Sequence, residues 1–201
     1  MGVKGLWLLL RNKGHAADIH GKPSCPIPAS KIWVDVCGSQ FSTIRYAYSI
    51  AHSDTNNAHR RLEQQLIKLG KKDELVLYVD GHPAAEKANT HHQRKQNLLK
   101  ARERAYRALV TLEDRLQTNK RIRKHHMKTV YKELASAFSW TMKDRRGFVD
   151  YMANNGYEII LCATEADVKI AADCQEVDVV VTGDSDLLFY KSVPVVWRPM
   201  G

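Results

Sequence analysis

The sequence predicts an α/β domain with a mostly parallel central sheet flanked by helices. Short apolar runs alternate with helical segments along the chain, which is typical of parallel strands joined by crossover helices. The chain has 201 residues, of which 44% are hydrophobic, enough for one domain with a substantial core. Residues 84 to 155 interrupt the alternation with a proline-free stretch, far longer than a crossover requires.

Five apolar runs predict the strands. Most are rich in β-branched or aromatic residues, and all are short enough to be strands. Pro194 suits an edge strand, because proline has no N–H to donate to a central ladder. The runs are KIWVDV (31 to 36), ELVLYVD (74 to 80), YEIILC (157 to 162), VDVVVTG (177 to 183) and VPVVW (193 to 197).

Helices are predicted after the first and third strands and before the second. The segment before the second strand ends at Gly70, which suits a helix C-cap. The proline-free insertion is dominated by Lys, Arg, Ala, Leu and Glu, which are strong helix formers. The predicted crossover helices span 39 to 52, 56 to 70 and 165 to 176, and the insertion is predicted as helices at 84 to 117, 119 to 138 and 143 to 155.

The positive charge of the chain is concentrated in this insertion. The chain has 31 Lys and Arg against 22 Asp and Glu, a formal net charge of +9. Residues 87 to 132 hold fourteen basic residues against three acids, a net of +11, whereas residues 133 to 201 hold six against eleven, a net of −5. The basic segment is either a solvated helical hairpin or a positive structure above the sheet edge that binds a polyanion such as nucleic acid.

The cysteines and the N-terminal segment exclude several classes of protein. Cys25, Cys37, Cys162 and Cys174 form no CxxC pair and have no histidines at zinc-finger spacing, so reduced thiols are expected. The apolar run in MGVKGLWLLLRNKG is too short for a signal peptide or a membrane span, and Leu6 does not suit myristoylation. We expect a reducing compartment and no membrane association.

Six acidic residues follow the predicted strands at their carboxyl ends, which share one edge of a parallel sheet. Each alone is explained by a helix cap, a turn or a charged rim. Together they repel one another unless divalent cations neutralise them, and a site of carboxylate oxygens without histidine suits Mg²⁺ or Mn²⁺. The six are Asp35, Asp80, Glu165, Asp167, Asp184 and Asp186.

A carboxylate cluster of this kind is able to hold two metal ions about 3.5 to 4 Å apart, an arrangement that serves phosphodiester hydrolysis. A basic helical segment nearby is suited to hold a phosphate backbone. The residues therefore indicate a phosphodiesterase that acts on nucleic acid.

Five ordered motifs also resemble one family. They are MGVKGLW, VDVCG, YVDGHPAAEKANTHHQR, ATEADVKIAADC and VVTGDSDLLFY. The sequence resembles the flap endonuclease and XPG family of structure-specific 5′ nucleases, whose core has a PIN-like fold. The resemblance covers nearly all of residues 1 to 201 and implies one PIN-like domain. It implies an N-terminal nuclease region (1 to 83), a helical gateway and arch (84 to 155) and an internal nuclease region (156 to 201).

The resemblance assigns roles to the acids and to two basic residues. It makes the six acids the metal ligands, and it makes Lys87 and Arg94 the catalytic residues that hold and polarise the scissile phosphate. These two are seven residues apart and share a helix face. The alternative for both is an ordinary exposed basic side chain.

The resemblance also assigns nucleic-acid contacts. Phe41 is either a ring that stacks on a base or a core aromatic residue. Gly2 and Lys4 belong to an N-terminus that lies close to the substrate. His91, His92, His125 and His126 are expected to be solvated polar residues rather than ligands. The expected arch contacts to phosphates are Arg102, Arg104, Arg107, Lys120, Arg121, Arg123, Lys124 and Lys128.

The implied function is a nuclear flap endonuclease or 5′ exonuclease of DNA replication or repair. It would use two Mg²⁺ or Mn²⁺ ions on DNA with 5′ flaps or single-strand to duplex junctions. The family continues past Gly201 with a seventh acid and a helix–two-turn–helix motif, so slow cleavage is expected of these 201 residues alone. A non-catalytic nucleic-acid-binding module and an RNA-directed PIN-type nuclease are the alternatives, and the six acids favour an enzyme.

Overall fold

The computed structural model describes residues 6–14, 16, 29–51, 54–83 and 85–198. These residues contain a five-stranded sheet in which all neighbouring strands are parallel, with the order β3-β2-β1-β4-β5. The predicted α/β class and parallel sheet are confirmed. The strands are β1 (Ile32–Asp35), β2 (Leu75–Val79), β3 (Glu158–Leu161), β4 (Val179–Val181) and β5 (Val196–Trp197).

Helices cover both faces of the sheet, so the strand side chains are buried on both sides. On one face, Val34 and Leu77 pack in a core that includes Leu62 and Phe148, and all four side chains are fully buried. On the other face, Tyr78 and its neighbours pack against a second, smaller core. The first face is covered by α2 (Val36–Ile50), α3 (Thr55–Leu66) and α6 (Met142–Asn154), and the second by α7 (Ala166–Asp173) and the 3-10 helix η2 (Asp186–Phe189).

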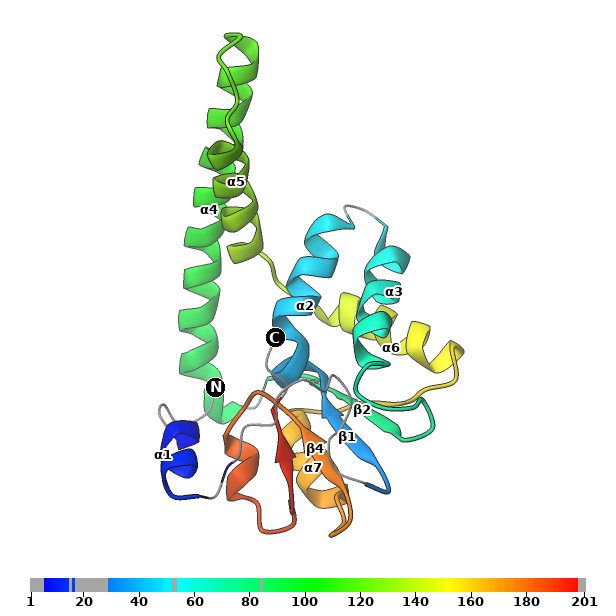
Figure 1. Ribbon diagram of the computed structural model, residues 1–201. Helices are drawn as coiled ribbons and strands as arrows, with labels where there is room; N and C mark the ends of the chain where they lie inside the picture. The colour runs from blue at the N-terminus through cyan, green and yellow to red at the C-terminus, as the bar shows by residue number, and fades with distance from the viewer. Residues whose placement is uncertain (1–5, 15, 17–28, 52–53, 84, 199–201) are drawn as a thin grey trace.

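The insertion forms a long antiparallel hairpin. A short 3-10 helix, η1 (Ala85–Lys87), leads into α4 (Ala88–Gln117), and α5 (Lys124–Ser136) returns beside it. Small side chains at Ala101 and Ala105 are buried, as is Val130, so the two helices pack closely. Figure 1 shows the hairpin extending well beyond the rest of the molecule, with most of its surface in solvent.

Several predicted boundaries are wrong for local physical reasons. The helix after the first strand begins at Val36 rather than 39, because the Asp35 side chain accepts from Gly38 N and caps it. Gly70 is not a C-cap, since α3 ends at Leu66. The helix predicted from 119 begins at Lys124, because Asn119 adopts a left-handed conformation with φ 49° and turns the chain.

Three further expectations bear on the fold. The edge strand predicted within residues 193 to 197 is β5, which lies at the edge of the sheet and pairs with β4. Cys37, Cys162 and Cys174 are free thiols, as predicted, whereas Cys25 lies outside the described residues.

The sequence did not predict α1 (Leu6–Asn12). Within the described ranges, no helix has the length and apolar character needed to cross a bilayer.

Candidate functional site

The six acids lie at the carboxyl ends of four adjacent strands. Asp35 is the last residue of β1, and Asp80 directly follows β2. Glu165 is the N-cap of α7, after β3, and Asp167 lies in the first turn of that helix. Asp184 and Asp186 follow β4, and Asp186 begins η2. The predicted placement at strand ends is confirmed for all six.

Two glycines bring the loops at this edge into close contact. The N–H of Gly81, after β2, donates to the Thr164 carbonyl at 2.6 Å, and a Cβ on Gly81 would lie 1.8 Å from the Cys162 carbonyl oxygen. The N–H of Gly183, after β4, donates to the Gly38 carbonyl at 3.2 Å, and a Cβ there would lie 2.6 Å from that oxygen. Only glycine permits these approaches without a shift of the backbone.

Asp35 is the buried acid of the group, with 6% of its surface exposed. One carboxylate oxygen accepts from Gly38 N at 2.8 Å, and the other accepts from the Thr182 hydroxyl at 2.8 Å. Burial is the largest cause that raises the pKa of Asp35 to about 7, and the negative charges of Asp80 and Asp167 add to it. A buried carboxylate facing like charges favours a nearby positive charge.

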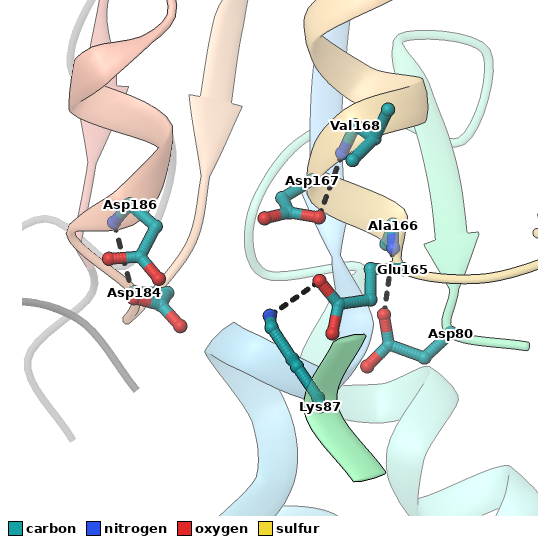
Figure 2. Close-up of polar contacts among 8 residues, drawn as sticks. All are labelled: Asp80, Lys87, Glu165, Ala166, Asp167, Val168, Asp184 and Asp186. Atoms are coloured by element: carbon teal, nitrogen blue, oxygen red, sulfur yellow. Dashed lines mark hydrogen bonds and ion pairs between the residues drawn. The ribbon is translucent and has the colours of Figure 1, made fainter. Parts of the chain in front are cut away.

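The acids after β2 and β3 interact through α7. Asp80 accepts from the backbone N–H of Ala166 at 2.8 Å, which holds it at the N-terminus of this helix (Figure 2). Burial and the charges of Glu165 and Asp80 raise the pKa of Asp167, while the Val168 N–H at 2.8 Å and the Lys87 charge lower it. Asp80, Glu165 and Asp167 therefore form one electrostatic group with Asp35.

Lys87 joins the base of the hairpin to this group. Its ammonium nitrogen lies 2.6 Å from a carboxylate oxygen of Glu165 (Figure 2). The hydrogen bond to Glu165 raises the pKa of Lys87, and the charges of Glu165, Asp167 and Asp186 contribute in the same direction. Lys87 is therefore a cation at neutral pH, and the hairpin begins at the acidic edge of the sheet.

Asp184 and Asp186 stand apart from the other acids. The N–H of Asp184 donates to the Thr182 hydroxyl at 3.0 Å, and the N–H of Asp186 donates to Asp184 at 3.2 Å. Figure 2 shows this pair separated from Asp80, Glu165 and Asp167. In the described part of the chain, no group of three or more His, Cys, Asp or Glu side chains has an arrangement that holds a metal ion.

Arg145 is a residue of this region that the sequence analysis missed. Its guanidinium donates to the backbone carbonyls of Asp80 and Gly81 at 3.0 and 2.9 Å and lies over the Trp140 ring. It fixes the loop that carries Asp80. No sequence signal distinguishes it from its neighbour Arg146, because the contact depends on the rotation of α6.

The expected nucleic-acid contacts are mostly exposed. Phe41 on α2 is 48% exposed, so it is not a core residue. Arg94 is exposed on α4, whereas Arg104 is paired with Glu133 at 3.0 Å. Gly2 and Lys4 lie outside the described residues. The other exposed arch residues are Arg102, Arg107, Lys120, Arg121, Arg123, Lys124 and Lys128.

Of the four histidines expected to be solvated, two are exposed and two are partly exposed. His92 and His125 are exposed, while His91 and His126 are only partly exposed. His126 also contacts the guanidinium of Arg115. None of the four is buried, so the expected exposure to solvent is found in full for His92 and His125 and in part for His91 and His126.

Comparison with known proteins supplies no further identification. No protein-family model matches the chain, and no curated protein matches it either. The functional proposal therefore depends on the fold, on the acids at the sheet edge and on the basic hairpin.

Proposed function

We propose that this chain is the catalytic core of a divalent-metal-dependent 5′ nuclease with a PIN-like fold, acting on flaps or single-strand to duplex junctions in nuclear DNA. One observation carries the proposal: six carboxylates end four adjacent parallel strands at the place where a strongly basic helical hairpin begins. Negative side chains at the base of a phosphate-binding surface would repel the substrate unless cations bind between them.

The side chains at the sheet edge have the oxygen chemistry that a hard divalent cation prefers. All six proposed ligands supply carboxylate oxygens, which Mg²⁺ and Mn²⁺ prefer. Desolvation and then the charges of Asp80 and Asp167 raise the pKa of buried Asp35, so a bound cation would stabilise its charged form. We infer that the carboxylates, whose charges repel one another, would move closer together as ligands when the cations bind. Two bound ions would lower the pKa of an attacking water and stabilise the leaving oxygen.

The chain's own cations would position the phosphate. Lys87 is protonated at neutral pH, and it lies at the boundary between the acids and the hairpin. Arg94 is exposed on α4, seven residues beyond Lys87, which is the last residue of η1. Together they are suited to hold the non-bridging oxygens of the scissile phosphate as negative charge develops there.

The exposed hairpin and Phe41 would hold the strand on either side of the cleaved bond. The basic side chains of α4 and α5 suit the phosphate backbone without a choice of sequence. The exposed ring of Phe41 is suited to stack on a base, a contact worth about 1 to 3 kcal/mol.

Metal binding and cleavage test the proposal separately. Calorimetric titration with Mn²⁺ should detect binding to the wild type that weakens at least tenfold in the variant Asp184→Asn, Asp186→Asn. The matched control is Asp73→Asn, Asp150→Asn, which removes the same charge from exposed positions outside the site. Equal binding by all three proteins would remove Asp184 and Asp186 from the site.

Cleavage is then measured on one labelled 5′-flap substrate made in DNA and in RNA, with Mg²⁺ or with EDTA. Slow Mg²⁺-dependent cutting of the DNA flap near its junction is expected. Faster cutting of the RNA flap would favour an RNA-directed nuclease. Metal binding and DNA binding without any cleavage would favour a binding module, and cleavage in EDTA would overturn the mechanism.

A further inference from the structure

The tip of the hairpin contains a cavity that is open to solvent and that the acidic site does not use. Residues 118 to 123 connect α4 to α5, and Asn119 turns the chain there. The cavity has a volume of about 400 Å³. It is lined by Arg115, Lys120, Arg121, Arg123, His125 and His126.

The charge of this cavity is all of one sign. Four of its lining residues are permanent cations, and no acid is among the described residues that line it. The first turn of α5 also borders the cavity and contains no acidic residue, so the positive end of the helix dipole adds to the same potential. A single bound anion would relieve this repulsion.

The hydrogen bonds around His126 leave one donor available to a bound anion. The backbone N–H of Arg123 lies 3.0 Å from Nδ1 of His126, and the guanidinium Nε of Arg115 lies 3.3 Å from Nε2. Desolvation and the charges of Arg115, His125 and Arg123 lower the pKa of His126, so the ring is neutral at pH 7. A neutral imidazole has only one acceptor nitrogen, so one of the two donors can bond instead to water or to an anion in the cavity.

We propose that this cavity binds a phosphate group with two negative charges, such as a terminal phosphate monoester. A phosphodiester carries one negative charge, whereas a terminal phosphate carries up to two and has three oxygens that accept from arginine. Four cations around one cavity therefore match the charge of a terminal phosphate better than that of a single internal phosphodiester. The cavity volume also accommodates a phosphate with part of an attached nucleoside.

Two sources supply this chemistry, the 5′-phosphate end of a single strand and a free polyphosphate. Binding of a 5′-phosphate end rests on the proposed function and would let the hairpin select phosphorylated ends. Binding of a free polyphosphate requires only the cavity and its charge.

The experiment measures binding in EDTA, where no cleavage takes place. The first probe is a 3′-labelled oligothymidine that carries either a 5′-phosphate or a 5′-hydroxyl, and its binding is measured by fluorescence anisotropy. The second probe is inorganic pyrophosphate, and its binding is measured by calorimetry. Two double variants remove charge from the cavity. One combines Arg115→Gln with Arg123→Gln, and the other combines Lys120→Gln with Arg121→Gln. The matched control removes the same charge from exposed positions of α4 that do not line the cavity, Lys95→Gln, Lys100→Gln. Circular dichroism checks that all variants keep their helices.

The expected result is about tenfold tighter binding of the phosphorylated oligonucleotide by the wild type and the control, and no preference in either cavity variant. Pyrophosphate binding that only the cavity variants lose, without an end preference, would support the same site with a free polyphosphate as its ligand. No end preference together with equal pyrophosphate binding by all proteins would overturn the proposal. Because no cleavage is needed, an inactive protein that prefers the phosphorylated end would contradict only the nuclease proposal.

Discussion

Replacing Asp35 by Asn should stabilise the metal-free protein at neutral and alkaline pH. Asp35 is buried, and its pKa is raised from an ordinary value of 3.8 to about 7, first by desolvation and then by Asp80 and Asp167. The folded state therefore binds the proton more tightly than the unfolded state does. The free energy of unfolding contributed by this group is highest below about pH 4 and falls as the pH rises to about 7.

The structure gives the size of the effect. At about 1.4 kcal/mol for each tenfold change in proton affinity, the difference between 3.8 and about 7 corresponds to a cost of about 4 kcal/mol above pH 7. Asn keeps the acceptor for Gly38 N, and the Thr182 hydroxyl can rotate to accept from its amide. Asn loses the attraction of a negative charge to the N-terminus of α2, up to about 1 kcal/mol. The net gain expected is about 3 kcal/mol.

Urea unfolding followed by tryptophan fluorescence, in EDTA from pH 4 to pH 8.5, measures this gain. Asp54→Asn is the matched control, because Asp54 caps α3 through the same kind of bond, to Asn57 N at 3.0 Å, but is exposed. The control should change the free energy of unfolding by less than about 0.5 kcal/mol. The reasoning fails if Asp35→Asn is no more stable than the wild type at pH 8, or if its advantage is equally large at pH 4.

Three other predictions follow from named contacts. Lys87→Gln should slow cleavage of bound flap by about a hundredfold or more while changing its dissociation constant only a few-fold, because the contact is made mainly in the transition state; equal losses in single-turnover rate and affinity would contradict this. Gly81→Ala should lower the free energy of unfolding by more than about 2 kcal/mol in the same urea assay, since its Cβ would lie 1.8 Å from the Cys162 carbonyl oxygen. The control Gly147→Ala on α6 should be neutral or stabilising, because the nearest atom to its Cβ would be a ring carbon of His59 at 3.7 Å. Replacing Arg102 and Arg107 with Gln should reduce the salt dependence of DNA binding, and an unchanged slope would make them ordinary surface residues.

The class of fold could be predicted from sequence because the strands are short and almost entirely apolar. The run Val179 to Val181 is buried on both faces, which is typical of a central parallel strand. Helix boundaries were predicted less well wherever a side chain or a turn decided them. The loop after Gln117 contains Lys and Arg, which are good helix formers, so composition extended the next helix back to residue 119.

The positions of the six acids could also be predicted, since the topology of a parallel sheet brings the strand ends to one edge. Their individual surroundings could not. The contact of Lys87 with Glu165 joins residues that are far apart in the sequence, and the contact of Arg145 with the Asp80 carbonyl depends on how α6 packs. The break between the two hairpin helices was predicted, and Asn119 is a residue type that favours such a turn, but the sequence does not show which side chains the turn brings together in the cavity.

The ion pair between Lys87 and Glu165 is compatible with a role for Lys87 in holding phosphate. The Lys87 side chain is 46% exposed and the Glu165 side chain 26%, so water screens the pair. Ion pairs at such exposure contribute about 0 to 1 kcal/mol, which a doubly hydrogen-bonded phosphate easily exceeds. The pair therefore keeps the Lys87 ammonium at the acidic edge, and its release from Glu165 costs little free energy. A fully buried pair would have held Lys87 against Glu165, and Lys87 would then have been unable to turn toward the proposed phosphate substrate.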